Sequence, residues 1–346
     1  MLIQGSVNTQ RTNLIIKKYN DLILKGIPYR DILVIVLNSY KKKSFIEELK
    51  KINKDCETKN IFTFAGLCYN AFLDNRDKIS VLINNQDKDY KPNLCGLEIS
   101  QFIFKQSIKE ADFSDYISKV NLLHQLFRRY SLIVQNCLTD KEIQKCSSIL
   151  NESFGDDAKK AIDSYKLKTI KYNSFDYLRQ LAILPFIYNE TDYFKNIKYL
   201  LFDDADEFSY AFWNFVYALM PGLKDFVIGY DNNGSSRCGY LCAYKSGVNN
   251  FISKFKPQIA GLNDKSVFAG TAKILYQAVI NGNKVKIKNI LNNHYIKRLD
   301  MLEAAAVYIS ELLNRGIQPK EIAVITPLAD NMLFEVLKDY NISFQN

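Results

Sequence analysis

Six consecutive apolar residues, Ile32 to Leu37, constrain the fold of this chain more than any other feature of its sequence. A strand that is buried on both faces, as in a parallel sheet, has such an unbroken apolar run, whereas a half-exposed strand alternates. Shorter runs of the same kind occur at Ile61–Phe64, Tyr199–Phe202 and Phe226–Gly229. The sequence therefore predicts a parallel sheet with both faces covered.

Helical patterns alternate with these runs in the first part of the chain. The apolar stretch Leu2–Gln4 predicts a strand, and a loop separates it from apolar residues at helical spacing between residues 14 and 24. Gly26 stands where a helix stop belongs, and a second helix is expected from about Lys43 to Ile52. Alternating strands and helices predict βαβ units and a doubly wound α/β sheet.

The pattern changes between residues 71 and 195, where helical segments separated by polar breaks replace the strand-like runs. No strand is expected in this region. The pattern therefore predicts a helical domain that is inserted between two parts of an α/β domain, residues 1–70 and 196–284. The expected helices are Ser100–Glu110, Tyr116–Cys137, Asp140–Leu150, Asp156–Tyr165 and Ser174–Tyr188.

The last part of the chain has a helical pattern and then a strand pattern. A helix is expected at Leu302–Asn314, a stop at Gly316 and a strand at Glu321–Thr326. One strand and one further helix cannot close a sheet. Residues 285–346 are therefore expected to form the beginning of a second, incomplete lobe, which is either truncated or completed from elsewhere.

Composition narrows the classes of protein without naming a function. The 46 Lys and Arg against 37 Asp and Glu, a net charge of +9, are compatible with a polyanionic partner and equally with a solvated basic face. Seven scattered cysteines and two histidines argue against a disulfide framework and a zinc site. No apolar run approaches the ~18 residues of a membrane span, and no leader pattern follows Met1, so a cytoplasmic protein without a membrane partner is expected.

The turn after the first strand is the candidate phosphate site. This turn lies between a predicted strand and a predicted helix, which is the context of the P-loop GxxxxGK[ST]. Its sequence, Gly5-x-x-x-x-Gln10-Arg11-Thr12, differs from that motif by two substitutions. In an intact loop the backbone N–H groups and the Lys bind phosphates, and the Ser or Thr hydroxyl binds Mg²⁺. Gln10 adds a Cβ, and Arg11 replaces a compact ammonium with a longer planar group. The alternative is an ordinary strand-to-helix turn.

Two carboxylates follow the strand that ends at Phe202. An apolar strand that ends in Asp203-Asp204 is typical of the Walker B motif, in which the first carboxylate holds Mg²⁺ and the second acidic group orients the attacking water. The alternative for an isolated acidic pair is the solvated start of a loop. Together the two motifs predict Thr12 and Asp203 as metal ligands and Asp204 as the catalytic residue.

In the order of these elements the chain resembles the superfamily 1 DNA helicases of the UvrD/Rep type, which include the related AddB and RecC subunits. Family members have Thr-Phe-His-Ser, Asp-Glu-Ala-Gln-Asp, Gly-Asp-x-x-Gln-Ser and Asn-Tyr-Arg-Ser motifs. The matching segments here are Thr63–Leu67, Asp203–Ser209, Gly229–Ser235 with Asn233 near the Gln, Ser266–Ala269 with Phe268 at the Arg, and, as the opening of the second lobe, Gly316–Ile325 with Tyr340–Phe344.

The resemblance implies a P-loop, RecA-like parallel sheet with a large inserted helical domain and the start of a second RecA-like lobe. It implies ATP and Mg²⁺ as cofactors if nucleotide binding is retained, and otherwise none. Departures from the family pattern at the Lys, the general base and the Arg imply weak or absent hydrolysis. The implied nucleotide-binding residues are Gly5, Gln10, Arg11, Thr12 and Asn233.

The resemblance also implies single-stranded DNA as a partner. The family places DNA contacts directly after the second strand, where three lysines could neutralise phosphates and an aromatic ring could stack on a base. The alternative is that the lysines form a solvated first turn of the helix and that Phe64 is a core residue. The predicted DNA-binding residues are Tyr40, Lys41, Lys42, Lys43, Thr63 and Phe64.

Three functions follow from these observations. The preferred one is a helicase-derived DNA-binding protein of repair or recombination that acts beside a motor or nuclease subunit. The second is the N-terminal part of an active ATP-dependent DNA helicase. The third is an interaction scaffold that binds neither nucleotide nor DNA.

Overall fold

The chain forms two compact units, residues 1–267 and 268–346. The computed structural model describes residues 1–6, 9–79, 91–111, 113, 119–147, 152–188, 192–235, 237–238, 242–262, 274–275, 278–279, 282, 284, 293–326 and 331–343. The first unit combines an α/β part with a helical segment, and the second unit is mostly helical in its described residues.

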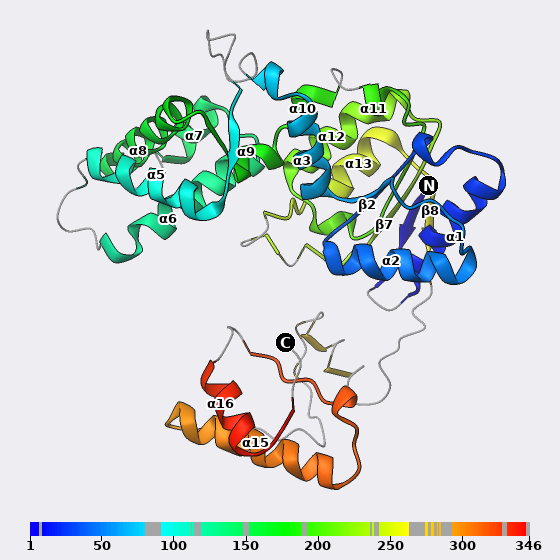
Figure 1. The fold of residues 1–346 in the computed structure, drawn as a ribbon, viewed down its shortest axis with the longest axis vertical. Coiled ribbons are helices and arrows are strands. Elements are labelled where there is room, and N and C mark those ends of the chain that lie inside the picture. Colours follow the sequence, from blue (N-terminus) through cyan, green and yellow to red (C-terminus); the bar gives the residue numbers. More distant parts are fainter. Residues whose placement is uncertain are drawn as a thin grey trace. The chain divides into compact units, whose positions relative to one another are not determined.

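A six-stranded sheet forms the centre of the first unit (Figure 1). Its order is β3-β2-β6-β7-β1-β8, and every neighbouring pair is parallel, which confirms the predicted parallel sheet. The carboxyl ends of all six strands therefore lie along one edge. The strands are β1 (Leu2–Gln4), β2 (Ile32–Val36), β3 (Ile61–Thr63), β6 (Tyr199–Phe202), β7 (Asp225–Tyr230) and β8 (Ile259–Gly261).

Helices cover both faces of this sheet (Figure 1). The helices of the α/β part are α1 (Arg11–Leu24), α2 (Ser39–Ile52), α3 (Phe64–Asp74), α10 (Leu184–Ile187), α11 (Asp192–Lys195), α12 (Tyr210–Leu219) and α13 (Gly247–Phe255). Along β2, Val34 and Val36 pack in one core with α1 and α2, whereas Leu33 and Ile35 pack in a second core with α3 and α12. This alternation explains the unbroken apolar run, because each successive side chain enters a core on one side or the other.

The ends of two elements differ from expectation because side chains cap the helices. Helix α2 begins at Ser39 and not at Lys43, since the Asn38 side chain accepts a hydrogen bond from the Lys41 backbone N–H at 2.9 Å. Thr63 caps α3 in the same way, by accepting from the Gly66 N–H at 3.0 Å, so Phe64 begins a helix and does not end a strand. The expected stop of α1 is confirmed, with Gly26 at φ +78°.

The segment between β3 and β6 is largely helical, and it has an apolar core of its own. It also contains two short parallel strands, β4 (Asn93–Cys95) and β5 (Ser174–Asp176), so the expectation of no strands is wrong. The predicted helix Ser174–Tyr188 is accordingly divided into β5, α9 (Tyr177–Leu181) and α10. Three-residue strands have too few side chains to reveal a period. The remaining helices are α5 (Leu97–Glu110), α6 (Lys119–Gln135), α7 (Asp140–Ser147) and α8 (Glu152–Lys171).

The second unit is built around two helices, α15 (Arg298–Asn314) and α16 (Asn331–Asp339), which pack through Leu302, Ala306 and Leu333. Between them a short 3₁₀ turn, η6 (Pro319–Glu321), follows Gly316. The strand predicted at Glu321–Thr326 is absent, because no described strand pairs with this segment. The described residues also form the 3₁₀ turns η1 (Tyr29–Asp31), η2 (Arg76–Lys78), η4 (Ala205–Glu207) and η5 (Met220–Gly222).

None of the helices in the described part of the chain is both long and apolar enough to cross a membrane. The longest, α8, has 20 residues but carries charged side chains along its whole length.

Candidate functional site

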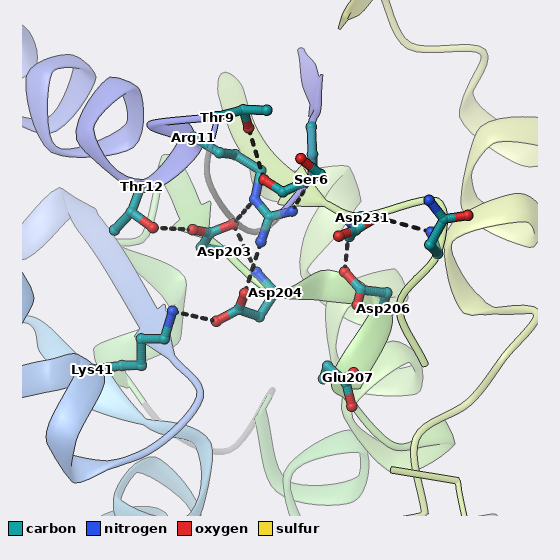
Figure 2. A network of polar contacts seen from close by, with 12 residues as sticks. Ser6, Thr9, Arg11, Thr12, Lys41, Asp203, Asp204, Asp206, Glu207 and Asp231 are labelled. Atoms are coloured by element: carbon teal, nitrogen blue, oxygen red, sulfur yellow. Dashed lines mark hydrogen bonds and ion pairs between the residues drawn. The ribbon is translucent and has the colours of Figure 1, made fainter. Parts of the chain in front are cut away.

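The two segments predicted to form one site meet at the carboxyl edge of the sheet (Figure 2). Gly5 directly follows β1, and Asp203 directly follows β6, with only β7 between these strands. Polar groups that follow neighbouring parallel strands gather at this edge, which is the usual position of ligand sites in open α/β sheets. The 191 positions between Thr12 and Asp203 are thus bridged by the sheet itself.

Arg11 is the centre of the site. Its Nε donates a hydrogen bond to Asp203 Oδ1, its Nη1 donates to the Gly5 carbonyl oxygen at 2.7 Å, and its Nη2 donates to Asp204 Oδ1 at 2.7 Å. The residue is only 6% exposed. A planar guanidinium can satisfy three acceptors in different directions at once, which an ammonium on a lysine stem does less well. Arg11 therefore ties the turn after β1 to the end of β6.

Both carboxylates are also bound by other groups. Asp203 Oδ2 accepts a hydrogen bond from Thr12 Oγ1 at 2.5 Å, and its Oδ1 also accepts from the Asp204 N–H at 2.8 Å. Asp204 Oδ2 forms an ion pair with Lys41 Nζ at 3.4 Å. Each of the four carboxylate oxygens consequently has a donor, and two positive side chains balance two negative ones (Figure 2).

Burial and nearby charges of opposite sign shift the pKa values of these groups in opposite directions. Burial lowers the pKa of Arg11, but attraction from Asp203, Asp204 and Asp206 more than reverses this, so the pKa lies above its ordinary value. Burial and the negative charge of Asp203 raise the pKa of Asp204, and Lys41 and Arg11 only partly offset this. Arg11 is accordingly charged throughout the accessible pH range, whereas ionised Asp204 depends on its positive neighbours.

Gly229 in β7 provides the space for the pair. A Cβ at this position would lie 2.3 Å from Asp203 Oδ1 and 3.0 Å from the Cδ and Cγ atoms of Arg11. The aliphatic part of Arg11 therefore passes directly over the backbone of the strand that separates β1 from β6. Any side chain larger than hydrogen at residue 229 would displace Arg11, Asp203 or both.

Two residues of the site have left-handed backbone conformations. Gln10 has φ 58° and ψ 24°, and Asp204 has φ 54° and ψ 38°. This region is unfavourable for residues with a Cβ, at a cost of about 1–3 kcal/mol each, and it is the region that glycine adopts readily. The Gln10 side chain is exposed. Gln10 stands at the second glycine position of the predicted P-loop pattern, and its backbone has a conformation that glycine adopts readily.

The turn between β1 and α1 is closed by its own side chains. Thr9 Oγ1 donates to the Ser6 carbonyl oxygen at 2.9 Å, and a Cβ on Gly5 would lie 2.1 Å from Thr9 Oγ1. Residues 7 and 8 of the predicted phosphate loop lie outside the described residues. Glycine is therefore required at residue 5 for this close approach, and its backbone carbonyl also accepts the hydrogen bond from Arg11.

A second carboxylate, Asp206, holds the loop that follows β7. It accepts hydrogen bonds from the backbone N–H groups of Asp231 at 2.8 Å and Ser235 at 3.3 Å, and a Cβ on Gly234 would lie 1.7 Å from its Oδ2. Asn233 in this loop is exposed, and its N–H donates to Asp231 Oδ1 at 2.8 Å. Among the described contacts, Asn233 is bound to this loop network and not to Arg11.

The lysines predicted to contact DNA lie in the first turn of α2, beside the site. Lys41 reaches Asp204, Lys42 Nζ lies 5.6 Å from the centroid of the Phe62 ring, and Lys43 Nζ lies 4.0 Å from a carboxylate oxygen of Glu47. Tyr40 is 79% exposed. The aromatic ring and two of the three ammonium groups are thus at the surface, while Lys41 belongs to the Arg11 network.

Phe64 and Thr63 have structural positions that differ from the predicted DNA contact. Phe64 is 8% exposed and packs edge-to-face on Phe212 with ring centroids 5.0 Å apart, so its ring cannot stack on a base without unpacking the core. Thr63 uses its hydroxyl oxygen to cap α3. The core alternative is correct for Phe64, and Tyr40 is left as the exposed aromatic residue of the predicted set.

The residues present do not fit a magnesium ion in this arrangement. Mg²⁺ is bound through carboxylate oxygens and waters, and it demands near-octahedral geometry. Here each oxygen of Asp203 and Asp204 already accepts from Arg11, Thr12, Lys41 or the backbone. The described residues include no group of three or more His, Cys, Asp or Glu side chains that could hold a metal. Metal binding would require the Arg11 and Lys41 side chains to move away from the carboxylates of Asp203 and Asp204.

Sequence reasoning identified Arg11, Thr12, Asp203 and Asp204 but assigned Lys41 to DNA alone. An ion pair between residues so distant in sequence has no local signature. The best available signal was an Arg at the Lys position of the predicted P-loop pattern, in a chain with two carboxylates after a later strand. The predicted motif at 266–269, which includes Phe268, lies outside the described residues.

Comparison with known proteins gives no independent assignment. No protein-family model matches the chain, and no curated protein matches it.

Proposed function

We propose that this chain is a helicase-derived DNA-binding protein with weak or absent ATP hydrolysis, which serves DNA repair or recombination beside a motor or nuclease subunit. The observation that carries the proposal is the direct contact of Arg11 and Thr12 with Asp203 at one edge of a parallel sheet. Turns after neighbouring parallel strands lie near each other in any open α/β sheet. Direct side-chain contact between this turn and the acidic pair is what we expect if the two segments derive from a phosphate site and its carboxylates.

The arrangement of the polar groups supports weak hydrolysis. A general base needs a carboxylate oxygen that can accept a hydrogen bond from the attacking water. Both oxygens of Asp204 instead face cations, Arg11 at 2.7 Å and Lys41 at 3.4 Å. Loss of one preorganised polar group at a reacting centre typically costs about 2.7–4 kcal/mol of transition-state stabilisation, so several such changes together would remove useful turnover.

Retained DNA binding is supported by the surface beside the site. Tyr40, Lys42 and Lys43 lie where β2 ends, next to the end of β6, on the same edge of the sheet. Contact with single-stranded nucleic acid requires positive charge and an accessible aromatic face, and it does not require a catalytic geometry. This surface can therefore continue to bind DNA in a protein whose nucleotide site no longer hydrolyses ATP.

We expect Tyr40→Ala to weaken binding of an unstructured single-stranded DNA by about 5- to 150-fold, the equivalent of about 1–3 kcal/mol for one stacked base. Tyr40→Phe should keep most of the affinity, because the aromatic face remains. Fluorescence anisotropy with a labelled oligothymidine measures both. Equal affinity of Tyr40→Ala and the unaltered protein would show that the exposed ring does not contact DNA.

Lys42, which is half-buried, and Lys43, which is exposed, provide a second readout of the same surface. Removing Lys42 and Lys43 should lower the slope of log affinity against log salt concentration by about 0.7 for each lost phosphate contact. The matched control is Lys50→Ala with Lys51→Ala, which removes the same charge from the other end of α2. If the control lowers the slope equally, the effect is one of net charge and the surface is not a DNA site.

The two alternative functions are outcomes of the same measurements. ATP turnover above roughly 1 s⁻¹ with single-stranded DNA present, an ordinary enzyme rate, would favour part of an active helicase. DNA binding that is absent, or that does not change with salt, would favour an interaction scaffold.

A further inference from the structure

The polar network at the sheet edge is complete without any added ion. Arg11 and Lys41 face Asp203 and Asp204, so two positive charges are matched by two negative charges. Buried carboxylates are tolerated only when they are paired or coordinate a metal. The Arg11 guanidinium supplies the pairing that a divalent cation supplies in a site of this type.

The surroundings of Arg11 are shaped to its side chain. Its Cγ and Cδ atoms lie 3.0 Å from where a Cβ on Gly229 would be, its Nη1 reaches the Gly5 carbonyl, and the residue before it has a left-handed conformation at the start of α1. The three guanidinium nitrogens of Arg11 each donate to a separate acceptor, and its aliphatic part packs on the backbone of Gly229. The surrounding residues thus define one position for this side chain. A side chain that folded in only by chance would lack these contacts.

We infer that Arg11 is the permanent cation of this site: its guanidinium replaces the divalent metal ion between Asp203, Asp204 and the Thr12 hydroxyl, so that the lobe is locked and independent of metal and nucleotide. The lock joins the turn after β1, the end of β6 and, through Lys41, the start of α2. The DNA-binding surface proposed on α2 is then held in place continuously and is not switched by a nucleotide cycle.

The test compares the response of three proteins to Mg²⁺ alone and to Mn²⁺ alone, read as thermal unfolding. The unaltered chain should show no change in Tm between chelator and millimolar metal. Arg11→Ala should lose stability in chelator and regain a part of it in metal, by about 5 °C at a hundredfold excess over Kd. Arg30→Ala removes the same charge from the exposed turn η1 and should not respond to metal.

Two results would overturn the inference. One is a Tm of the unaltered chain that rises with Mg²⁺ and loses that rise in Asp203→Asn, because the carboxylate would then take a metal while Arg11 is present. The other is an Arg11→Ala protein that folds and does not respond to either metal.

If Arg11→Ala does not fold, Mn²⁺ binding to the unaltered chain decides the question by water-proton relaxation. No binding supports the lock, and binding that Asp203→Asn abolishes contradicts it. The inference rests on the geometry of Arg11 and not on DNA binding. A chain that fails the DNA measurements can still show the locked site, and a chain with an open metal site can still bind DNA.

Discussion

Arg11→Ala is expected to lower the free energy of unfolding by about 3–5 kcal/mol, which is the usual cost of removing one partner from a buried ion pair. The loss is large because Asp203 stays buried and Asp204 half-buried while their main counter-charge disappears. Lys41 can compensate only in part, since it reaches one oxygen of Asp204 at 3.4 Å. Urea denaturation measures the change as a lower midpoint with an unchanged slope.

Arg30→Ala is the matched control for this experiment. Arg30 is exposed, and surface substitutions of this kind usually change stability by no more than about 0.5 kcal/mol. A similar small loss for Arg11→Ala would mean that the carboxylates are solvated in solution and that the network contributes little to the fold.

Arg179→Ala is expected to cost a similar amount, about 3–5 kcal/mol, but in the helical segment between β3 and β6. Arg179 Nε donates to Asp176 Oδ2 at 2.6 Å, its Nη2 donates to Thr169 Oγ1 at 2.6 Å, and Asp176 is fully buried. Tyr130 donates its hydroxyl proton to the same carboxylate at 2.9 Å. Without the guanidinium, Asp176 would be left with a single side-chain donor and the Arg179 backbone N–H.

Hydrogen exchange locates this second effect. Amide protection should fall in α5, α6, α8 and α9, whose core adjoins Asp176, and should fall less in β2 and β6 of the large sheet. Arg128→Ala, on an exposed position of α6, removes the same charge without the buried pair and should leave protection unchanged. Uniform loss of protection across both parts would show that the segment has no separate stability.

The parallel sheet could be predicted because its central strands, β2 above all, are buried on both faces. Each side chain of β2 packs in one of two cores, so every position of this strand is apolar and the run is easily recognised in the sequence. The strands β4 and β5 could not be predicted, because they have three residues each and pair only with one another. The strand predicted at 321–326 was wrong because an apolar run indicates only strand propensity, whereas a strand also needs a neighbouring strand to pair with.

Four members of the site could be predicted, but neither the part of Lys41 in it nor the contacts between its side chains could. Motif spacing identified Arg11, Thr12, Asp203 and Asp204, since the order of strand, turn and helix determines which residues reach the sheet edge. It could not indicate that Arg11 turns toward both carboxylates, because a long flexible side chain chooses its partners only in the folded state. Nor could it separate Phe64 from Tyr40, whose exposures of 8% and 79% depend on a cap at Thr63 and on tertiary packing.

A double-mutant cycle on Arg11 and Asp203 tests the central claim most directly, namely that the turn after β1 and the acidic end of β6 form one site. Unfolding free energies of Arg11→Ala, Asp203→Asn and the double variant give the interaction energy between the two side chains. Direct contact predicts a coupling of about 2 kcal/mol, toward the upper part of the range for residues that share a network, whereas distant residues add within about 0.3–0.5 kcal/mol. Additive losses would contradict the account, because two side chains that do not interact cannot belong to one site.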